Sequence, residues 1–137
     1  MNRTLVICKP DAVERGLVGE LIGRLERKGL RLVAAELRLI DEATASEHYE
    51  EHHGKPFYGD LVQFITRTPS MVLVVEGPDE NTWSIVRTLM GPTNPAEAPP
   101  GTMRGDLGTL LTENLVHGSD SAESAAREIA IFFPGLA

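Results

Sequence analysis

The most chemically distinctive part of the sequence runs from Asn114 to Asp120, where His117 stands between apolar residues and a Gly-Ser-Asp turn. Histidine has the unperturbed pKa nearest to physiological pH, so a neutral imidazole can attack an electrophile and later leave again. The residues before His117 are typical of a strand, and a predicted helix follows the turn. Because reactive groups are well held at the ends of rigid elements, the sequence indicates His117 as a candidate nucleophile.

Three cationic side chains in other segments could hold phosphate groups near such a nucleophile. Lys9 ends a predicted strand, Arg87 lies in the last turn of a predicted helix, and Arg104 follows a Pro-Gly-Thr-Met bend. An arginine guanidinium is planar and binds two phosphate oxygens at once. Taken singly, each residue could instead be a surface charge. The sequence has no glycine-rich phosphate-binding motif, so side chains would have to hold the phosphates.

Two further histidines, His48 and His52, are spaced to lie on one face of a helix. A zinc-protease helix needs glutamate directly after the first histidine, but Tyr49 stands there and no third ligand is evident. We therefore expect half-exposed helix residues rather than a metal site.

Phe57 and Glu128 each allow two interpretations. Phe57 follows a predicted helix break, where it could stack on a flat ring or pack in the core. Glu128 lies in the last predicted helix, from which it could hydrogen-bond the ring of His117 and fix its tautomer, or face solvent.

The composition limits the classes of partner. The chain has 137 residues, of which 42% are hydrophobic and 24% charged, as in an ordinary globular domain. A net charge of −7 argues against binding to nucleic acid or to a membrane, but not against a polyanionic small molecule in a cationic pocket. The single cysteine, Cys8, is expected to be a buried thiol in a reducing cytoplasm, and we find no signal-peptide pattern.

Apolar runs and turn signals predict the elements that must position these residues. Strands are expected at residues 3–8, 30–40, 71–75 and 115–117. Helices are expected at 18–28, from Asp41 through His52, at 60–66, at 80–90, and after the capping pair Asp120-Ser121. Residues 91–105 have the prolines and weak periodicity of a functional or disordered loop. This order predicts one α+β domain over residues 1–137, a ferredoxin-like four-stranded antiparallel sheet (βαββαβ) with helices on one face.

Short motifs along nearly the whole chain occur in the order and spacing of one known family. They are Arg3-Thr4-Leu5, Lys9-Pro10-Asp11-Ala12-Val13, Gly16-Leu17-Val18-Gly19-Glu20, His48-Tyr49, Lys55-Pro56-Phe57-Tyr58, Met90-Gly91-Pro92-Thr93-Asn94-Pro95, Pro100-Gly101-Thr102-Met103-Arg104-Gly105-Asp106 and Asn114-Leu115-Val116-His117-Gly118-Ser119-Asp120-Ser121. On these motifs the sequence closely resembles the nucleoside diphosphate kinases, and the last block is highly specific to them.

The resemblance implies an enzyme that reversibly transfers the γ-phosphoryl group of a nucleoside triphosphate to a nucleoside diphosphate. His117 would take the phosphoryl group in a ping-pong mechanism, with Glu128 orienting its ring and Ser119 close by. Lys9 and Tyr49 would act at the transferring phosphate.

The resemblance also implies a nucleotide site with little base specificity and Mg²⁺ as the cofactor. The ion would be held mainly by the nucleotide phosphates, with Asp120 as a candidate contact through water. The nucleotide-binding residues would be Lys9 and Asn114 at the ribose, Arg87, Thr93 and Arg104 at the β- and γ-phosphates, and Phe57, Leu61 and Leu111 at the base.

Members of this family are homo-hexamers or homo-tetramers built from dimers, and the differences of this chain in the C-terminal tail and the loops favour a hexamer. Arg67-Thr68 stands where the family usually has Ser-Gly, which alters a turn rather than the pocket. Two other function classes stay open: a ferredoxin-like regulatory module that binds a small ligand without chemistry, and a phosphocarrier charged by a partner kinase.

Overall fold

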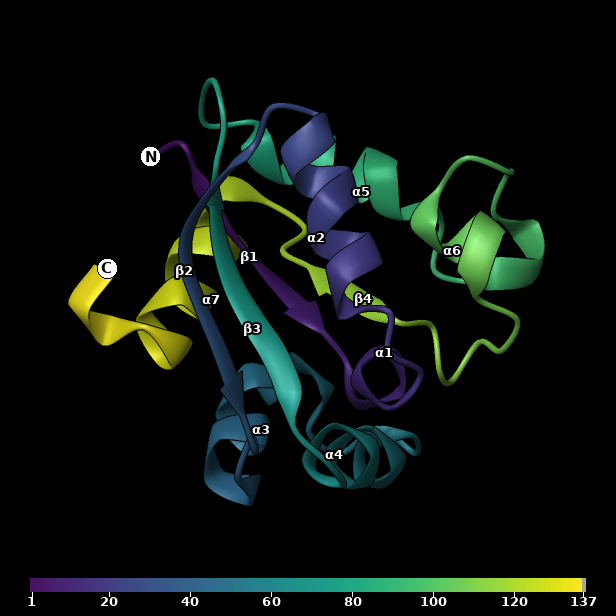
Figure 1. Cartoon of the computed structure of the whole chain (residues 1–137). Coiled ribbons are helices and arrows are strands. Elements are labelled where there is room, and N and C mark those ends of the chain that lie inside the picture. The colour runs from purple at the N-terminus through teal and green to yellow at the C-terminus, as the bar shows by residue number, and fades with distance from the viewer. Residues whose placement is uncertain (137) are drawn as a thin grey trace.

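The computed structural model describes residues 1–136, which form one four-stranded sheet with helices packed against it (Figure 1). The strands are β1 (Arg3–Cys8), β2 (Arg31–Arg38), β3 (Ser70–Glu76) and β4 (Val116–Gly118). The α-helices are α1 (Pro10–Glu14), α2 (Val18–Arg27), α3 (Glu42–His48), α4 (Tyr58–Thr66), α5 (Thr82–Met90), α6 (Met103–Leu107) and α7 (Ala122–Phe132). Short 3₁₀ turns are η1 (Glu50–His52), η2 (Pro95–Glu97) and η3 (Pro134–Leu136).

The sheet has the strand order β2-β3-β1-β4, and every neighbouring pair is antiparallel. This confirms the ferredoxin-like arrangement predicted from the sequence. β1 lies in the interior of the sheet, so its residues Leu5 to Cys8 are fully buried and read as one apolar run. Among residues 1–136, β4 pairs with β1 alone, and the register places His117 opposite Ile7.

Helices cover both faces of the sheet, so the prediction of helices on one face was wrong. Val6 and Cys8 of β1 pack with residues of α2 and α5, whereas Leu5 and Ile7 pack with residues of α3, α4 and α7. In Figure 1, α2 lies in front of the sheet and α7 behind it. Successive side chains of a strand point to opposite faces, and β1 is apolar on both, so both faces need a covering layer.

Three local differences from the predicted elements lie near the candidate residues. The helix that begins after Asp41 ends at His48, and His52 belongs to the separate turn η1. The short helix α1 was not predicted, although proline is well accepted in a first helical turn. Residues 91–105, predicted as a loop, include η2 and the start of α6, which are capped by the side chains of Asn94 and Thr102.

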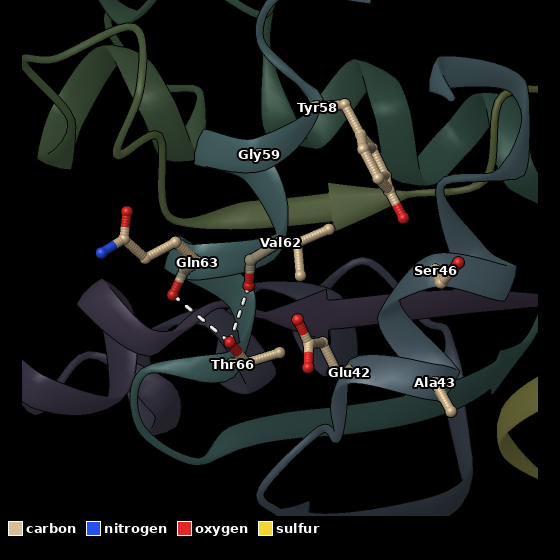
Figure 2. A pocket seen from close by; sticks show the side chains of 8 residues that line it. All are labelled: Glu42, Ala43, Ser46, Tyr58, Gly59, Val62, Gln63 and Thr66. Carbon is tan, nitrogen blue, oxygen red and sulfur yellow. Dashed lines mark hydrogen bonds between the residues drawn. The ribbon is translucent and has the colours of Figure 1, made fainter. Parts of the chain in front are cut away.

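A groove of about 740 Å³ runs between α3 and α4 and is shown in Figure 2. Glu42 is the charged residue of its lining, and the Thr66 hydroxyl donates to the carbonyl oxygens of Val62 and Gln63. This lining offers neither a histidine nor a cation to a phosphate group. The candidate chemistry therefore belongs to another part of the molecule.

Candidate active site

His117 and the predicted phosphate-binding side chains meet in a smaller cavity of about 230 Å³. The predicted residues that line it are Lys9, Arg87, Thr93, Arg104, Asn114, His117, Asp120 and Glu128. The sequence did not single out the other residues of the lining as binding residues, and these are Glu51, His52, Met90, Val116 and Gly118. The cavity thus gathers side chains from nearly the full length of the chain around the ends of β1 and β4.

The backbone just before β4 is strained. Leu115 has a φ of 73°, a left-handed value that a bulky apolar residue rarely adopts. Its N–H donates to Oδ2 of the buried Asp11 at 3.0 Å, and its carbonyl accepts from the backbone N–H of Lys9 at 2.8 Å. These two bonds hold the strained residue from both sides and bring Lys9 beside the strand that carries His117.

Replacing Asp11 with alanine is expected to lower the free energy of unfolding by about 2–3 kcal/mol, because the buried Leu115 N–H loses its acceptor. Urea denaturation measures this loss. Asp11→Asn is the matched control, since its amide oxygen can still accept the hydrogen bond, and it should retain most of the stability. Equal losses in the two variants would contradict the importance of this bond.

His117 is held by a carboxylate from α7. Its Nε2 lies 2.8 Å from Oε1 of Glu128, and the Ser119 hydroxyl donates to the same oxygen at 2.8 Å. Burial of Glu128 acts to raise its pKa, but the hydrogen bond and charge of His117 hold that pKa below its usual value. A carboxylate only accepts hydrogen bonds, so Nε2 carries the hydrogen and Nδ1 keeps its lone pair. Nδ1 is therefore the free nitrogen of a ring that lines the cavity.

His48 packs directly on His117, and the expectation of a half-exposed residue was wrong. His48 is 6% exposed, and its ring centroid lies 4.7 Å from that of His117 and 5.5 Å from that of Phe132. The reason is that α3 ends here against α7, which turns the histidine into the protein. Burial, with the nearby His117, lowers the pKa of His48 to about 3, so its ring is neutral at physiological pH.

Lys9 and Arg87 bring positive charge to the cavity and donate to neutral oxygens. Nζ of Lys9 donates to Oδ1 of Asn114 at 2.9 Å, and the Asn114 amide donates to the Thr93 carbonyl at 3.0 Å. Arg87 donates to the carbonyl of Gly118 at 3.0 Å. No carboxylate of residues 1–136 takes these donors, so both cations stay available to an anionic ligand, although Glu51, Asp120 and Glu128 also line the cavity.

Arg104 is a buried anchor of the same cavity. Its guanidinium donates to the backbone carbonyls of Asn114 and Gly91 at 3.0 Å and of Val116 at 2.6 Å. Burial, with repulsion from Arg87, lowers the pKa of Arg104 to about 10, which leaves it charged at neutral pH. Arg104 therefore holds both the loop after α5 and the strand that carries the histidine.

Tyr49 and Ser119 are buried residues that the lining of the cavity does not include. The Tyr49 ring lies 4.7 Å from the ring of His48, and burial, with the charge of Glu128, raises the pKa of Tyr49 to about 12. Ser119 is buried against Glu128. Both residues therefore support the histidine pair from the protein side.

The three predicted base-binding residues also lie outside the lining. Phe57 is 46% exposed, and its ring centroid lies 5.4 Å from that of His52, so Phe57 stands at the mouth of the cavity. Leu61 packs against the core between the sheet and the helices α3, α4 and α7. Leu111 is 57% exposed. A flat ring could reach Phe57 without entering the cationic part of the site.

Known proteins match this chain over nearly its full length. The family model for nucleoside diphosphate kinase matches residues 2–136. The chain belongs to the nucleoside diphosphate kinase family. The nucleoside diphosphate kinase of Saccharopolyspora erythraea is 59% identical, over 98% of this chain and 98% of its own length.

Solved nucleoside diphosphate kinase structures have the same fold. A family protein from Babesia bovis superposes with a TM-score of 0.94 at 45% identity, over 99% of this chain and 90% of that one. A halophilic nucleoside diphosphate kinase from Halobacterium salinarum, solved in complex with CDP, has a TM-score of 0.91 at 50% identity, over 96% of this chain and 86% of that one.

Membership of the nucleoside diphosphate kinase family makes the chain a phosphotransferase that passes the γ-phosphoryl group from a nucleoside triphosphate to a nucleoside diphosphate. Enzymes of this family generally need a divalent cation. None of the helices within residues 1–136 has the length and apolar character that a membrane span requires.

Sequence reasoning missed the parts played by Asp11 and His48. Both stand inside motifs that carry the resemblance, Lys9-Pro10-Asp11 and His48-Tyr49, so the signal was present. Asp11 follows the proline that begins α1, and its carboxylate accepts from the strained backbone N–H of Leu115. His52, which lines the cavity, had no signal beyond its spacing from His48.

Proposed function

We propose that the γ-phosphoryl group passes through Nδ1 of His117 in a ping-pong mechanism. The observation that supports this is the geometry of the ring: Glu128 binds Nε2, and Nδ1 is the free nitrogen in a cavity lined by three cationic side chains. In the first half-reaction, Nδ1 bonds to the γ-phosphorus, the bond to the β–γ bridging oxygen breaks, and the nucleoside diphosphate leaves. In the second, a terminal oxygen of the acceptor diphosphate attacks that phosphorus, and His117 leaves as the free imidazole.

The cations would position the phosphates and stabilise their charge, which is most of what phosphoryl transfer requires. Lys9 would contact the transferring group and, with Asn114, the ribose. The other side chains proposed to act at the phosphates are Arg87, Thr93 and Arg104 along the β- and γ-groups and Tyr49 near the reacting phosphate. Lys9, Asn114 and Thr93 are already joined by hydrogen bonds, which makes this part of the site preorganised.

We propose Mg²⁺ as the divalent cation. Mg²⁺ keeps several waters and binds one or two carboxylates together with substrate phosphates. Asp120 is an exposed carboxylate of the lining, and its Oδ1 accepts from the Ser124 hydroxyl at 2.7 Å. A single exposed carboxylate of this kind fits a contact through water, while the phosphates hold the ion. When bound, the ion supplies charge neutralisation to the phosphates.

The base is proposed to stack on Phe57 at the mouth of the cavity, with Leu61 and Leu111 as apolar walls. The Phe57 ring is half-exposed and accessible there. Stacking and apolar contact do not read the hydrogen-bonding edge of a base. Purine and pyrimidine nucleotides should therefore both be accepted.

Lys9 is expected to set the alkaline limit of activity. Burial, with repulsion from Arg104, lowers the pKa of Lys9 to about 8, so the free enzyme loses this charge as pH rises through about 8. kcat/KM, which reports the free enzyme, should fall above that pH. The free energy of unfolding changes in the opposite sense. The pKa of a lysine in the unfolded chain is about 10.4, so between about pH 8 and that value the unfolded chain binds more protons than the folded one. The contribution of Lys9 to stability therefore rises over this range.

A pH series of kcat/KM for the native chain and for Lys9→Arg measures this limit. Arginine keeps its charge, so the alkaline limb should move to higher pH even though the variant is slower. If kcat/KM of Lys9→Arg falls over the same pH range as that of the native chain, the alkaline fall is caused by a group other than Lys9.

A two-step radiolabel experiment tests the histidine route. The protein is mixed with Mg²⁺ and γ-labelled ATP, the phosphoenzyme is isolated, and unlabelled GDP and CDP are added. A base-stable, acid-labile phosphoenzyme that labels both GTP and CTP is the expected result, and its formation without any partner protein also separates the enzyme from a phosphocarrier. Failure to label the protein while ATP binds would leave a nucleotide-binding module.

We further propose one domain over residues 1–137, a homo-oligomer and a cytoplasmic location. Leu37 and Leu39 are exposed at the end of the edge strand β2 and beyond it, as expected of a surface that another copy covers. A hexamer is favoured over a tetramer, and light scattering on the purified protein distinguishes the two masses. Cys8 is free and buried, in keeping with a reducing compartment.

A further inference from the structure

Behind the phosphate side of the cavity, three potential metal ligands converge on the buried side of His117. One ligand atom each from His48, His117 and Glu128 lies within 4.8 Å of the others. His48 comes from the end of α3, His117 from β4 and Glu128 from α7, so the cluster forms only in the folded chain. The proposed transfer mechanism uses His117 and Glu128 but leaves His48 without a task.

His48 is a second and independent indication of a ligand. The residue is more than nine-tenths buried, and its Nδ1 has no hydrogen-bond partner among residues 1–136. A buried polar nitrogen without a partner is costly, and such groups usually have a role that the bare protein does not show.

We propose that His48, His117 and Glu128 form an inhibitory site for a zinc-class divalent transition-metal ion. Two imidazoles and one carboxylate suit Zn²⁺ rather than Mg²⁺, which prefers oxygen ligands. Tetrahedral Zn²⁺ at about 2.0–2.1 Å from each donor places the donors about 3.3 Å apart. The distance of 2.8 Å between Nε2 of His117 and Oε1 of Glu128 would therefore have to lengthen slightly. The ligand nitrogen of His48 would have to move closer to these two atoms.

Occupation of this site would block transfer by changing the tautomer of His117. The metal binds Nε2 in place of its proton, which is released to solvent, and Nδ1 takes up a proton from solvent, so the ring stays neutral. An Nδ1 that carries a proton has no lone pair for phosphorus. This consequence depends on the proposed histidine route, whereas metal binding itself does not.

The experiment uses the nucleotide-free full chain and separates binding from activity. Calorimetric titration with ZnCl₂ and the visible spectrum with Co²⁺ measure stoichiometry and geometry, and we expect one ion per chain in a tetrahedral field. Labelling of the protein from γ-labelled ATP and Mg²⁺ is then compared with and without preincubation in Zn²⁺. Zinc should abolish labelling, and EDTA should restore it.

His48→Phe is the diagnostic variant, because it keeps a flat ring against His117 and Phe132 but removes the ligand. It should weaken Zn²⁺ binding at least about 100-fold, since even outer-shell partners of a metal are worth 10–100-fold. His53→Phe is the matched control, an exposed histidine of the same segment, and should bind Zn²⁺ as the native chain does. Equal Zn²⁺ affinity in all three proteins, or no binding at all, would overturn the proposal.

Nitrogen NMR of the histidine rings of the native chain provides a test that needs no variant. Zinc should convert His117 from the tautomer protonated at Nε2 to the one protonated at Nδ1. If zinc binds but the tautomer of His117 and the rate of labelling stay unchanged, the proposal of an inhibitory site is overturned. Zinc binding in a protein that never labels, even without zinc, would instead disprove the histidine route and leave the metal site standing.

Discussion

Replacing His117 with alanine should abolish the labelled phosphoenzyme and lower kcat by at least about 10⁴-fold. The reason is that alanine offers no nucleophile, and loss of the nucleophile in enzymes with covalent intermediates typically removes most of the catalysis. The labelling experiment and steady-state transfer from ATP to GDP measure the two effects. The cavity keeps Lys9, Arg87 and Arg104, so ATP should still bind.

His53→Ala is the matched control for this variant, because His53 is an exposed histidine that does not line the cavity. It should label and turn over as the native chain does. Retention of a phosphoenzyme in His117→Ala would show that another side chain takes the phosphoryl group. Loss of ATP binding together with labelling would show instead that the substitution had disturbed the cavity as a whole.

Replacing Arg104 with alanine should weaken both turnover and folding. Its buried guanidinium donates to the carbonyls of Gly91, Asn114 and Val116, and all three would lose this donor, although the Asn114 carbonyl would keep the backbone N–H of Val116. Because hydrogen bonds that involve a charged group are worth more than neutral ones, we expect the free energy of unfolding to fall by about 3–5 kcal/mol. Urea denaturation measures the stability, and kcat measures the loss of phosphate contacts in the folded fraction.

Arg87→Ala provides the comparison, since Arg87 lines the same cavity but donates to the single carbonyl of Gly118. It should lose activity with a stability loss of only about 1–2 kcal/mol. The assignment of Arg104 as an anchor fails if both substitutions have the same effect on unfolding.

The sheet order could be predicted because the strands and helices alternate in a pattern that few folds accommodate. The covering of both faces was missed although β1 contained the signal, since its unbroken apolar run from Leu5 to Cys8 requires apolar partners on either side. Element ends were less predictable than element types. The end of α3 at His48 depends on contact with Phe132 of α7, and spacing within one helix carries no information about a partner 84 residues away.

The lining of the candidate site was predicted better than its internal contacts. Motif order pointed to Lys9, Arg104 and His117, which line one cavity. Which atoms satisfy Arg104 could not be inferred, because its acceptors are backbone carbonyls and every residue offers the same one. The positive φ of Leu115 was equally hidden, since glycine or asparagine would have been the expected residue there.

The short strand β4 has a consequence for how the enzyme loses function. It has three residues and a neighbour on one side only, so side-chain bonds from Arg87 and Arg104 to its carbonyls contribute much of its attachment. Such an edge opens at a lower free energy than the whole molecule unfolds. Amide hydrogens of β4 should exchange with solvent sooner than those of β1 and β3. Warming would then inactivate the enzyme before it melts, and bound nucleotide would delay that inactivation.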